Sequence, residues 1–285
     1  MEVSFYPGCT AHSTGLEYSS SLKAVFDSLG VNLLEIEDWN CCGAAAAHAL
    51  NGLLGYALPA RNIAIAQELD LPLVVPCAGC FNALRRAQKL LAEEKEAGRK
   101  IEEIVGFKYN GKLQIQAMVD FMLKRIGLNK LKPHLVRPLS GLKVACYYGC
   151  ALVRRPEVAG IGDHENPTFL DDLVGCLNAR PVEWSYKADC CGADLALTHA
   201  SIVENLVDKI TGMAIEAGAN CLVCSCGLCQ INLEMRQTGR NGLKLPVFYF
   251  TELMGLAMDL EGKNKWWKKH LVNPEPLLWA LNLLE

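Results

Sequence analysis

The sequence lacks the features that would direct it to a membrane, a secretory route or nucleic acid. Residues 1–6 contain no basic segment and start no cleavable apolar stretch, so we expect no secretion signal. A formal net charge of −3 does not predict binding to nucleic acid through the overall field. The most apolar run, residues 41–60, is interrupted by His48, Asn51, Gly52, Gly55 and Pro59. That run therefore predicts a buried helix rather than a membrane span, and we expect the protein in the cytoplasm.

The sequence also lacks the familiar ferredoxin run C-x2-C-x2-C-x3-C, although it has 14 cysteines among 285 residues. Ordinary cubane clusters are therefore expected on another chain. Because cytosolic thiols are kept reduced, this many cysteines predict metal or redox chemistry rather than structural disulfides.

Ten of the cysteines form one motif that is written twice. In order, the gaps between its five members are 31, 0, 34 and 2 residues in the first half and 39, 0, 34 and 2 in the second. A glycine follows the adjacent pair in both halves. The members are Cys9, Cys41, Cys42, Cys77 and Cys80 in the first half, and Cys150, Cys190, Cys191, Cys226 and Cys229 in the second. This internal repeat predicts a duplicated architecture with two equivalent sites.

The segments between the cysteines predict an α/β fold. Short β-rich runs and helical patterns alternate along the first half. The predicted strands are 2–6, 32–36 and 72–76, and the predicted helices are 16–29 and 44–69. The second half begins with a predicted strand at 142–148. Such alternation predicts a parallel sheet with right-handed crossovers, in which all strands end at one edge. Each cysteine follows a strand end, so the fold would gather five of them at one edge in each half.

Two domains are expected, residues 1–135 and 141–285. An amphipathic helix at 114–126 is predicted to end the first, and its counterpart in the second half is 248–258. Residues 131–141 form the predicted linker. The charged, glycine-punctuated stretch 93–112 is interpreted as a solvated insertion or helix end rather than a partner site.

Five cysteines per half favour an iron–sulfur cluster over a single metal ion. Four thiolates would suit zinc or a simple cluster. Adjacent side chains generally point in different directions, so an extended multi-iron cluster is better able to use both members of the pair. Zinc in one domain and a thioredoxin-like dithiol remain alternatives. The other four cysteines, Cys146, Cys176, Cys221 and Cys224, have no counterpart in the first half and are expected to be structural, although Cys221 and Cys224 form a second CxxC.

The duplicated motif resembles the paired CCG domains of the B-type subunit of heterodisulfide reductase. The resemblance spans nearly the whole chain and includes residues 269–274. It implies two pseudo-symmetric CCG domains, each a small parallel sheet flanked by helices. Each domain would hold a non-cubane [4Fe-4S] cluster on its five motif cysteines. Cys146 is the alternative ligand in place of Cys150. The resemblance also implies a cytoplasmic oxidoreductase that reduces a disulfide, such as the coenzyme M–coenzyme B heterodisulfide of methanogenesis.

Two partner subunits are implied by the same resemblance. Electrons would come from a C-type subunit that carries two cubane clusters, supplied in turn by a flavin-containing, electron-bifurcating A-type subunit. Cleaving a disulfide takes two electrons, whereas iron–sulfur clusters pass them singly, which explains a motif doubled on one chain. Related CCG domains also occur in glycolate oxidase, lactate-utilisation and succinate dehydrogenase-type complexes. The alternative function is therefore an electron relay or adaptor in a flavin-dependent dehydrogenase.

Several other residues are weaker candidates. His12 and His48 lie near the first-half cysteines in sequence, and His199 lies beyond the second Cys-Cys-Gly; each could protonate a departing thiolate, although a packed histidine is the commoner outcome. The tail at 263–269 mixes lysines with tryptophans. It is interpreted as a segment that docks to a partner protein rather than to nucleic acid.

Overall fold

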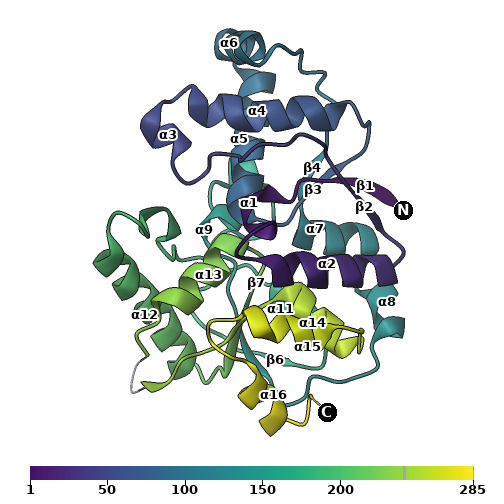
Figure 1. Cartoon of the computed structure of the whole chain (residues 1–285), viewed down its shortest axis with the longest axis vertical. Coiled ribbons are helices and arrows are strands. Elements are labelled where there is room, and N and C mark those ends of the chain that lie inside the picture. Colours follow the sequence, from purple (N-terminus) through teal and green to yellow (C-terminus); the bar gives the residue numbers. More distant parts are fainter. Residues whose placement is uncertain (240–241, 285) are drawn as a thin grey trace.

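Each half of the chain folds around its own parallel sheet (Figure 1). The computed structural model describes residues 1–239 and 242–284. The first half contains β1 (Glu2–Phe5), α1 (Gly8–Ala11), α2 (Leu16–Ser28), β2 (Asn32–Glu35), α3 (Ala47–Leu50), α4 (Leu54–Gln67), β3 (Leu73–Val75), α5 (Ala78–Glu93), α6 (Lys95–Val105), β4 (Ile115–Ala117), α7 (Met118–Phe121), the π-helix η1 (Met122–Ile126), α8 (Leu128–Leu131) and the 3₁₀-helix η2 (Lys132–His134). The second contains β5 (Lys143–Cys146), α9 (Cys150–Val153), α10 (Pro156–Ala159), α11 (Phe169–Cys176), β6 (Arg180–Pro181), η3 (Ala193–Leu195), α12 (Ala200–Glu216), β7 (Cys221–Cys224), α13 (Gly227–Arg236), β8 (Val247–Tyr249), α14 (Phe250–Ala257), α15 (Lys263–Trp266), η5 (Trp267–Lys269) and α16 (Glu275–Ala280).

The two sheets have the same topology. The strand orders are β2-β1-β3-β4 and β6-β5-β7-β8, and every pairing between neighbouring strands is parallel. The central strands β3 and β7 are buried along their whole length, as expected for parallel strands covered on both faces. The predicted α/β class with two pseudo-symmetric units is therefore confirmed.

Most predicted elements appear within a residue or two, but two helices were predicted wrongly. The helix expected at 44–69 is broken into α3 and α4, because the side chain of Asn51 accepts hydrogen bonds from the backbone of Leu53 and Leu54 at 2.8 and 3.3 Å. The helix expected at 114–126 begins as the strand β4, in which Ile115 and Ala117 are buried and Gln116 is only partly so. Each sheet thus has a fourth strand that the prediction did not contain.

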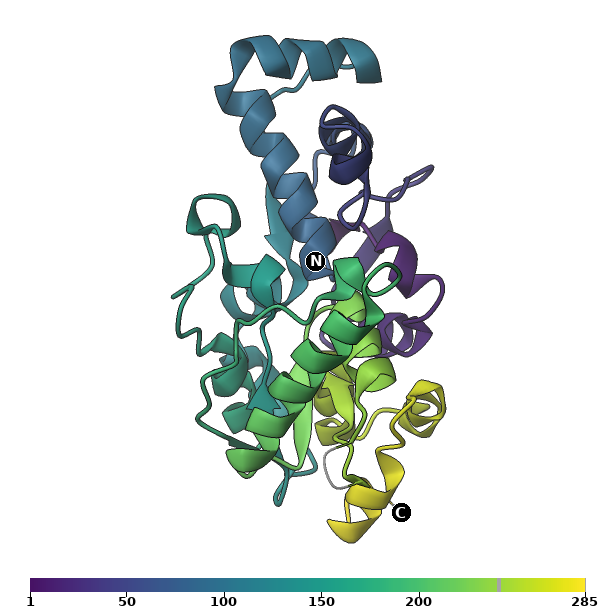
Figure 2. The ribbon, with the colours of Figure 1, turned by 90° about the vertical axis from the view of Figure 1, so that its left-hand side faces the viewer.

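The halves share one interior. Apolar side chains of both sheets belong to a single continuous core. Helix α2 of the first half packs against α14 and α15, and α5 packs against α9 and α10 (Figure 1). Helix α6 lies across the far end of α5, away from the second half (Figure 2).

The predicted linker and tail both pack against this body. Within 131–141, Leu131 and Leu139 are fully buried, and the backbone N–H of Val136 donates to the carbonyl of Ala257 at 2.9 Å. In the tail, Trp266 and Trp267 are buried in the chain's own core rather than exposed on a docking surface. Among the described helices, none combines the length and the apolar character needed to cross a bilayer.

Candidate metal centres

The motif cysteines lie just beyond the carboxyl ends of the strands. Strands β1, β2 and β3 end shortly before Cys9, Cys41 and Cys77, and the second half repeats this order with β5, β6 and β7. The two CxxC motifs also open helices, because Cys77 and Cys226 are the N-cap residues of α5 and α13. Thiolates at helix N-termini are stabilised by the free backbone N–H groups and the helix dipole.

In the first half the thiols contact one another. The Sγ atoms of Cys42 and Cys80 are 3.1 Å apart. Hydrogen bonds from Cys42 and Cys9 lower the pKa of Cys41 to about 2. The hydrogen bond between Cys9 and Cys41 raises the pKa of Cys9, and burial adds to this rise. Thiols held this close cannot all ionise unless a shared positive charge compensates them.

The second half repeats the arrangement. A hydrogen bond from Cys150 lowers the pKa of Cys190 to about 6. Hydrogen bonds from Cys229 lower the pKa of Cys191 and of Cys226. Each half therefore brings its motif thiols together through contacts between pairs of them, which is a donor set suited to a soft, multiply charged metal group.

Glycines give the thiols room. Gly8 and Gly149 directly precede the first cysteine of each motif and have φ of +73° and +69°. A Cβ at Gly8 would lie 3.0 Å from the Sγ of Cys80, and one at Gly149 would lie 3.3 Å from that of Cys229. A side chain at either position would therefore press on the CxxC sulfur as well as strain the backbone.

A tyrosine that the sequence prediction missed supports each site. Tyr6 and Tyr147 are buried, and their hydroxyls donate to the carbonyls of Asn40 at 2.8 Å and Asp189 at 2.6 Å, directly before the Cys-Cys pairs. Burial, followed by the charges of the neighbouring cysteines, raises the pKa of both tyrosines, so the phenols remain protonated donors. The signal was available, since both tyrosines stand three residues before the first motif cysteine.

The two sites meet. The Sγ atoms of Cys77 and Cys226, one from each half, are 3.7 Å apart. The backbone N–H of Gly79, in the first half, also donates to Cys226 and helps to lower its pKa. The first-half CxxC loop thus touches a sulfur of the second site directly.

A cavity of about 340 Å³ opens at this junction. Its walls include all five second-half motif cysteines. From the first half come Gly43 and Gly79 of the motif, together with His48, Asn82 and Arg86. Arg154, Arg155 and Asp194 complete its charged lining. Concave sites of this size, with a few convergent polar groups, are typical of small-molecule binding.

The remaining predicted residues divide between the cavity and other places. Of the three histidines, His48 lines the cavity, whereas His12 pairs with Glu35 at 3.0 Å and His199 contacts Thr198 at 2.9 Å. Cys146 is buried, with its pKa raised by burial and by Asp171, and Cys150 rather than Cys146 contacts the second site. Cys221 and Cys224 are buried, and Cys176 is partly buried.

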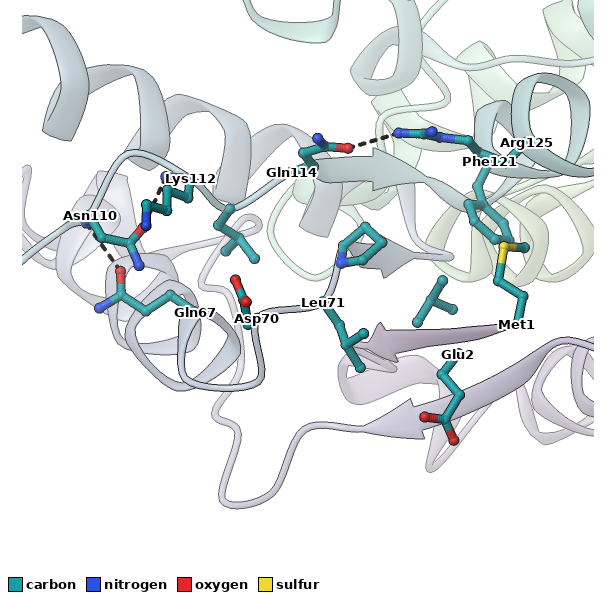
Figure 3. A pocket seen from close by; sticks show the side chains of 13 residues that line it. Met1, Glu2, Gln67, Asp70, Leu71, Asn110, Lys112, Gln114, Phe121 and Arg125 are labelled. Carbon is teal, nitrogen blue, oxygen red and sulfur yellow. Dashed lines mark hydrogen bonds between the residues drawn. The ribbon is translucent and has the colours of Figure 1, made fainter.

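A second cavity, of about 350 Å³, lies at the opposite edge of the first sheet (Figure 3). Glu2, Leu71 and Gln114 line it at the amino-terminal ends of β1, β3 and β4, and the amide oxygen of Gln114 accepts a hydrogen bond from Arg125 at 2.8 Å. Ligands of open parallel sheets bind at the carboxyl ends, so this cavity is separate from the cysteine sites.

The thiols of the motif and the backbone N–H groups around them suit an iron–sulfur group. Within residues 1–239 and 242–284, no group of three or more His, Cys, Asp or Glu side chains is arranged to hold a metal ion. The thiols instead contact one another in pairs, with backbone N–H groups of Gly43 and Gly192 donating to the sulfurs of Cys41 and Cys190 at 3.5 and 3.3 Å. N–H donors to the sulfurs are a feature that tunes iron–sulfur clusters.

Comparison with known proteins decides the family. The sequence matches the cysteine-rich CCG domain twice, over residues 3–85 and 144–234. The chain belongs to the CCG-domain family. The likeness to the B-type subunit of heterodisulfide reductase that the motif predicted is confirmed: the B subunit of the ferredoxin:CoB-CoM heterodisulfide reductase from Methanosarcina mazei is 27% identical over 269 residues, covering 90% of this chain and 89% of that protein.

Other relatives carry different names. The 8-methylmenaquinol:fumarate reductase membrane anchor subunit of Wolinella succinogenes is 30% identical over 270 residues, covering 92% of this chain and 94% of that subunit. Lactate utilization protein A 2 of Bacillus cereus is 25% identical over 266 residues, covering 91% of this chain and all of that protein. A crystal structure of a hypothetical protein from Helicobacter pylori has the same fold, with a TM-score of 0.70 at 12% identity over 95% of this chain; this chain spans 51% of that one.

Proposed function

We propose that this chain is the catalytic subunit of a heterodisulfide reductase-type complex and reduces a disulfide to two thiols in the cavity between its two cysteine sites. In this proposal the five motif cysteines of each half hold one non-cubane [4Fe-4S] cluster. When bound, each cluster supplies one electron. The balance is R–S–S–R′ + 2 e⁻ + 2 H⁺ → RSH + R′SH, with the electrons arriving from a two-cubane subunit that is reduced by a flavin-containing subunit.

The cavity is the single observation that carries this proposal. An electron relay needs room only for its cluster, yet the walls of this cavity of about 340 Å³ also carry His48, Arg86 and Arg155, which are not among the cluster's proposed ligands. The Sγ atoms of Cys77 and Cys226 are 3.7 Å apart, so a first-half cluster would lie next to the second-half one. A disulfide in the cavity would therefore lie against one site and within reach of the other.

The cavity's own side chains suit an anionic disulfide. Arg86 is held over the ring of Tyr56, 5.4 Å from its centroid, and Arg154 hydrogen-bonds the carbonyl of Ala188 at 3.1 Å. Arg155 has a left-handed backbone with φ of +60°, and among the described residues its guanidinium has no hydrogen-bond partner. It is therefore free to bind a carboxylate, sulfonate or phosphate of the substrate. In this proposal His48, which lines the cavity, supplies a proton to a departing thiolate.

The test is anaerobic purification with iron and sulfide quantitation, then electron paramagnetic resonance with candidate disulfides added. We expect acid-labile sulfide, and a disulfide that changes the spectrum. Stoichiometric zinc without sulfide would contradict the proposal.

Two cysteine variants test the two-cluster mechanism. Cys42→Ala and Cys191→Ala should each abolish disulfide reduction, because either change removes a thiolate ligand from one of the two sites. Cys176→Ala, which changes a thiol outside both motifs, is the matched control and should retain turnover. Full turnover by Cys42→Ala or Cys191→Ala would end the two-cluster mechanism.

A second candidate function is an electron relay in a flavin-dependent dehydrogenase complex. The 30% identity to a fumarate reductase subunit favours it. A relay's clusters would be reduced by the dehydrogenase, and no disulfide would alter their spectrum or be consumed. The cavity would then have no substrate, and Arg155→Ala would leave electron transfer unchanged.

A further inference from the structure

The hydroxyl of Tyr18 lies at the junction of the two cysteine sites. Tyr18 belongs to α2 of the first half and is 2% exposed. Its Oη is 3.3 Å from the carbonyl oxygen of Pro76 and 3.2 Å from that of Ser225. These residues directly precede Cys77 and Cys226, so one hydroxyl is shared by the loops that carry both CxxC motifs.

The geometry indicates a single proton shared between two acceptors. A phenol has one O–H, and two carbonyls at nearly equal distances make the hydrogen bond a three-centre one. The ring is fixed independently of the hydroxyl. It stacks on Tyr249 of the second half, with centroids 4.1 Å apart and planes 5° from parallel.

The loops that this hydroxyl joins bring the two sites into contact. Cys77 and Cys226 follow the two carbonyls, and their sulfurs are 3.7 Å apart although 149 residues separate them in sequence. Each is the N-cap of a helix, so a shift of α5 or α13 would change this distance.

We propose that Tyr18 is a positioning residue that fixes the separation and orientation of the two cysteine sites, and thereby the electronic contact between the groups they hold. The inference rests on the proposed function, since it concerns two clusters that act as a pair. A disulfide consumes two electrons in one turnover and each centre passes one, so the separation of the two centres affects how both electrons reach the substrate.

The test replaces Tyr18 with phenylalanine, which keeps the stacked ring and removes the hydroxyl. Tyr249→Phe is the matched control, because it removes a hydroxyl from the other ring of the same stack. That hydroxyl contacts Gln230 at 3.3 Å and neither of the two loop carbonyls. Four quantities are measured on the anaerobically purified chain. They are iron and sulfide content, the magnetic interaction between the two clusters by electron paramagnetic resonance, amide hydrogen exchange in residues 76–80 and 225–229, and the rate of disulfide reduction.

We expect Tyr18→Phe to keep its iron and sulfide, to change the magnetic interaction, and to speed amide exchange in both segments. Disulfide reduction should fall as well, by up to roughly 100-fold for a misplacement of the reacting centres by about 1 Å. Tyr249→Phe should change none of these.

Unchanged spectra and exchange in a fully loaded Tyr18→Phe, or equal changes in Tyr249→Phe, would overturn the inference and leave the proposed function standing. Wild-type protein without iron and sulfide would overturn the proposed function, and with it the electronic part of the inference.

Discussion

The buried imidazole of His270 allows a prediction whose size follows from the structure. Its Nδ1 is 2.8 Å from a carboxylate oxygen of Glu234 and its Nε2 is 3.0 Å from one of Glu252, and all three side chains are completely buried. Burial by itself would lower the pKa of His270, but the two carboxylates raise it to about 11. The imidazole is therefore a buried cation that ties the C-terminal segment to α13 and α14.

His270→Gln should destabilise the protein strongly and in a pH-dependent way. Removing one partner of a buried ion pair costs about 3–5 kcal/mol. At about 2 °C per kcal/mol, the Tm should fall by about 6–10 °C. The pKa of His270 is higher in the folded chain than its unfolded value of about 6.5. The charged imidazole therefore contributes its full share of the free energy of unfolding below about pH 6.5. That contribution is lost as the pH rises toward 11, by about 1.4 kcal/mol per pH unit.

Anaerobic calorimetry at about pH 6 and about pH 9 measures both effects. The Tm difference between wild type and His270→Gln should shrink at the higher pH, since the wild-type chain loses the stabilisation that the variant never had. His164→Gln, at an exposed position, is the control and should change the Tm at neither pH. A Tm difference that stays constant over this range would show that His270 acts by packing alone and would refute the charge assignment.

Three glycine substitutions, one of them a control, test the packing around the sites and between the halves. Gly8→Ala combines a left-handed backbone, which costs about 1–2 kcal/mol, with a Cβ 3.0 Å from the Sγ of Cys80. Both the Tm and the iron content of this variant should therefore fall. Gly30→Ala is the control: it has a similar φ but open space around its Cβ, so it should lower the Tm alone. Equal iron contents in the two variants would contradict this. Gly227→Ala would place a methyl group 2.7 Å from the Oγ1 of Thr10, across the boundary between the halves. We expect this variant to have a lower Tm, and Thr10→Ala in the same chain to restore the Tm in part. A double variant no more stable than Gly227→Ala alone would refute the clash.

The sequence predicted the elements that depend on local signals. Strand β1 and helix α2 appear almost at their predicted bounds, because α2 buries Tyr18, Leu22 and Val25 on one face and ends before Gly30, whose φ is +71°. The gathering of the cysteines followed from their places after strand ends in a parallel sheet. The domain boundaries at 135 and 141 stay a prediction.

What the sequence could not supply are features decided by distant contacts. Strand β4 has three residues, too few for a periodic pattern, and is formed by pairing with β3. Tyr18 touches Ser225 across 207 residues, and no local pattern marks it. The arginines of the cavity were missed for the same reason, since α5 and the segment after Cys150 meet only in the folded chain.

The duplication predicted two equivalent sites, yet the structure makes them unequal. All five second-half motif cysteines line the cavity, whereas the first-half motif contributes Gly43 and Gly79 to its wall and none of its thiols. The cause lies in which helices cover each site. Helix α5 of the first half carries Asn82 and Arg86 over the second-half cysteines, so the first half forms the cover of its partner's site. Two equal cysteine motifs therefore differ in how far a small molecule can reach them from the cavity. This access is decided by the helices and loops around a site and not by its cysteines.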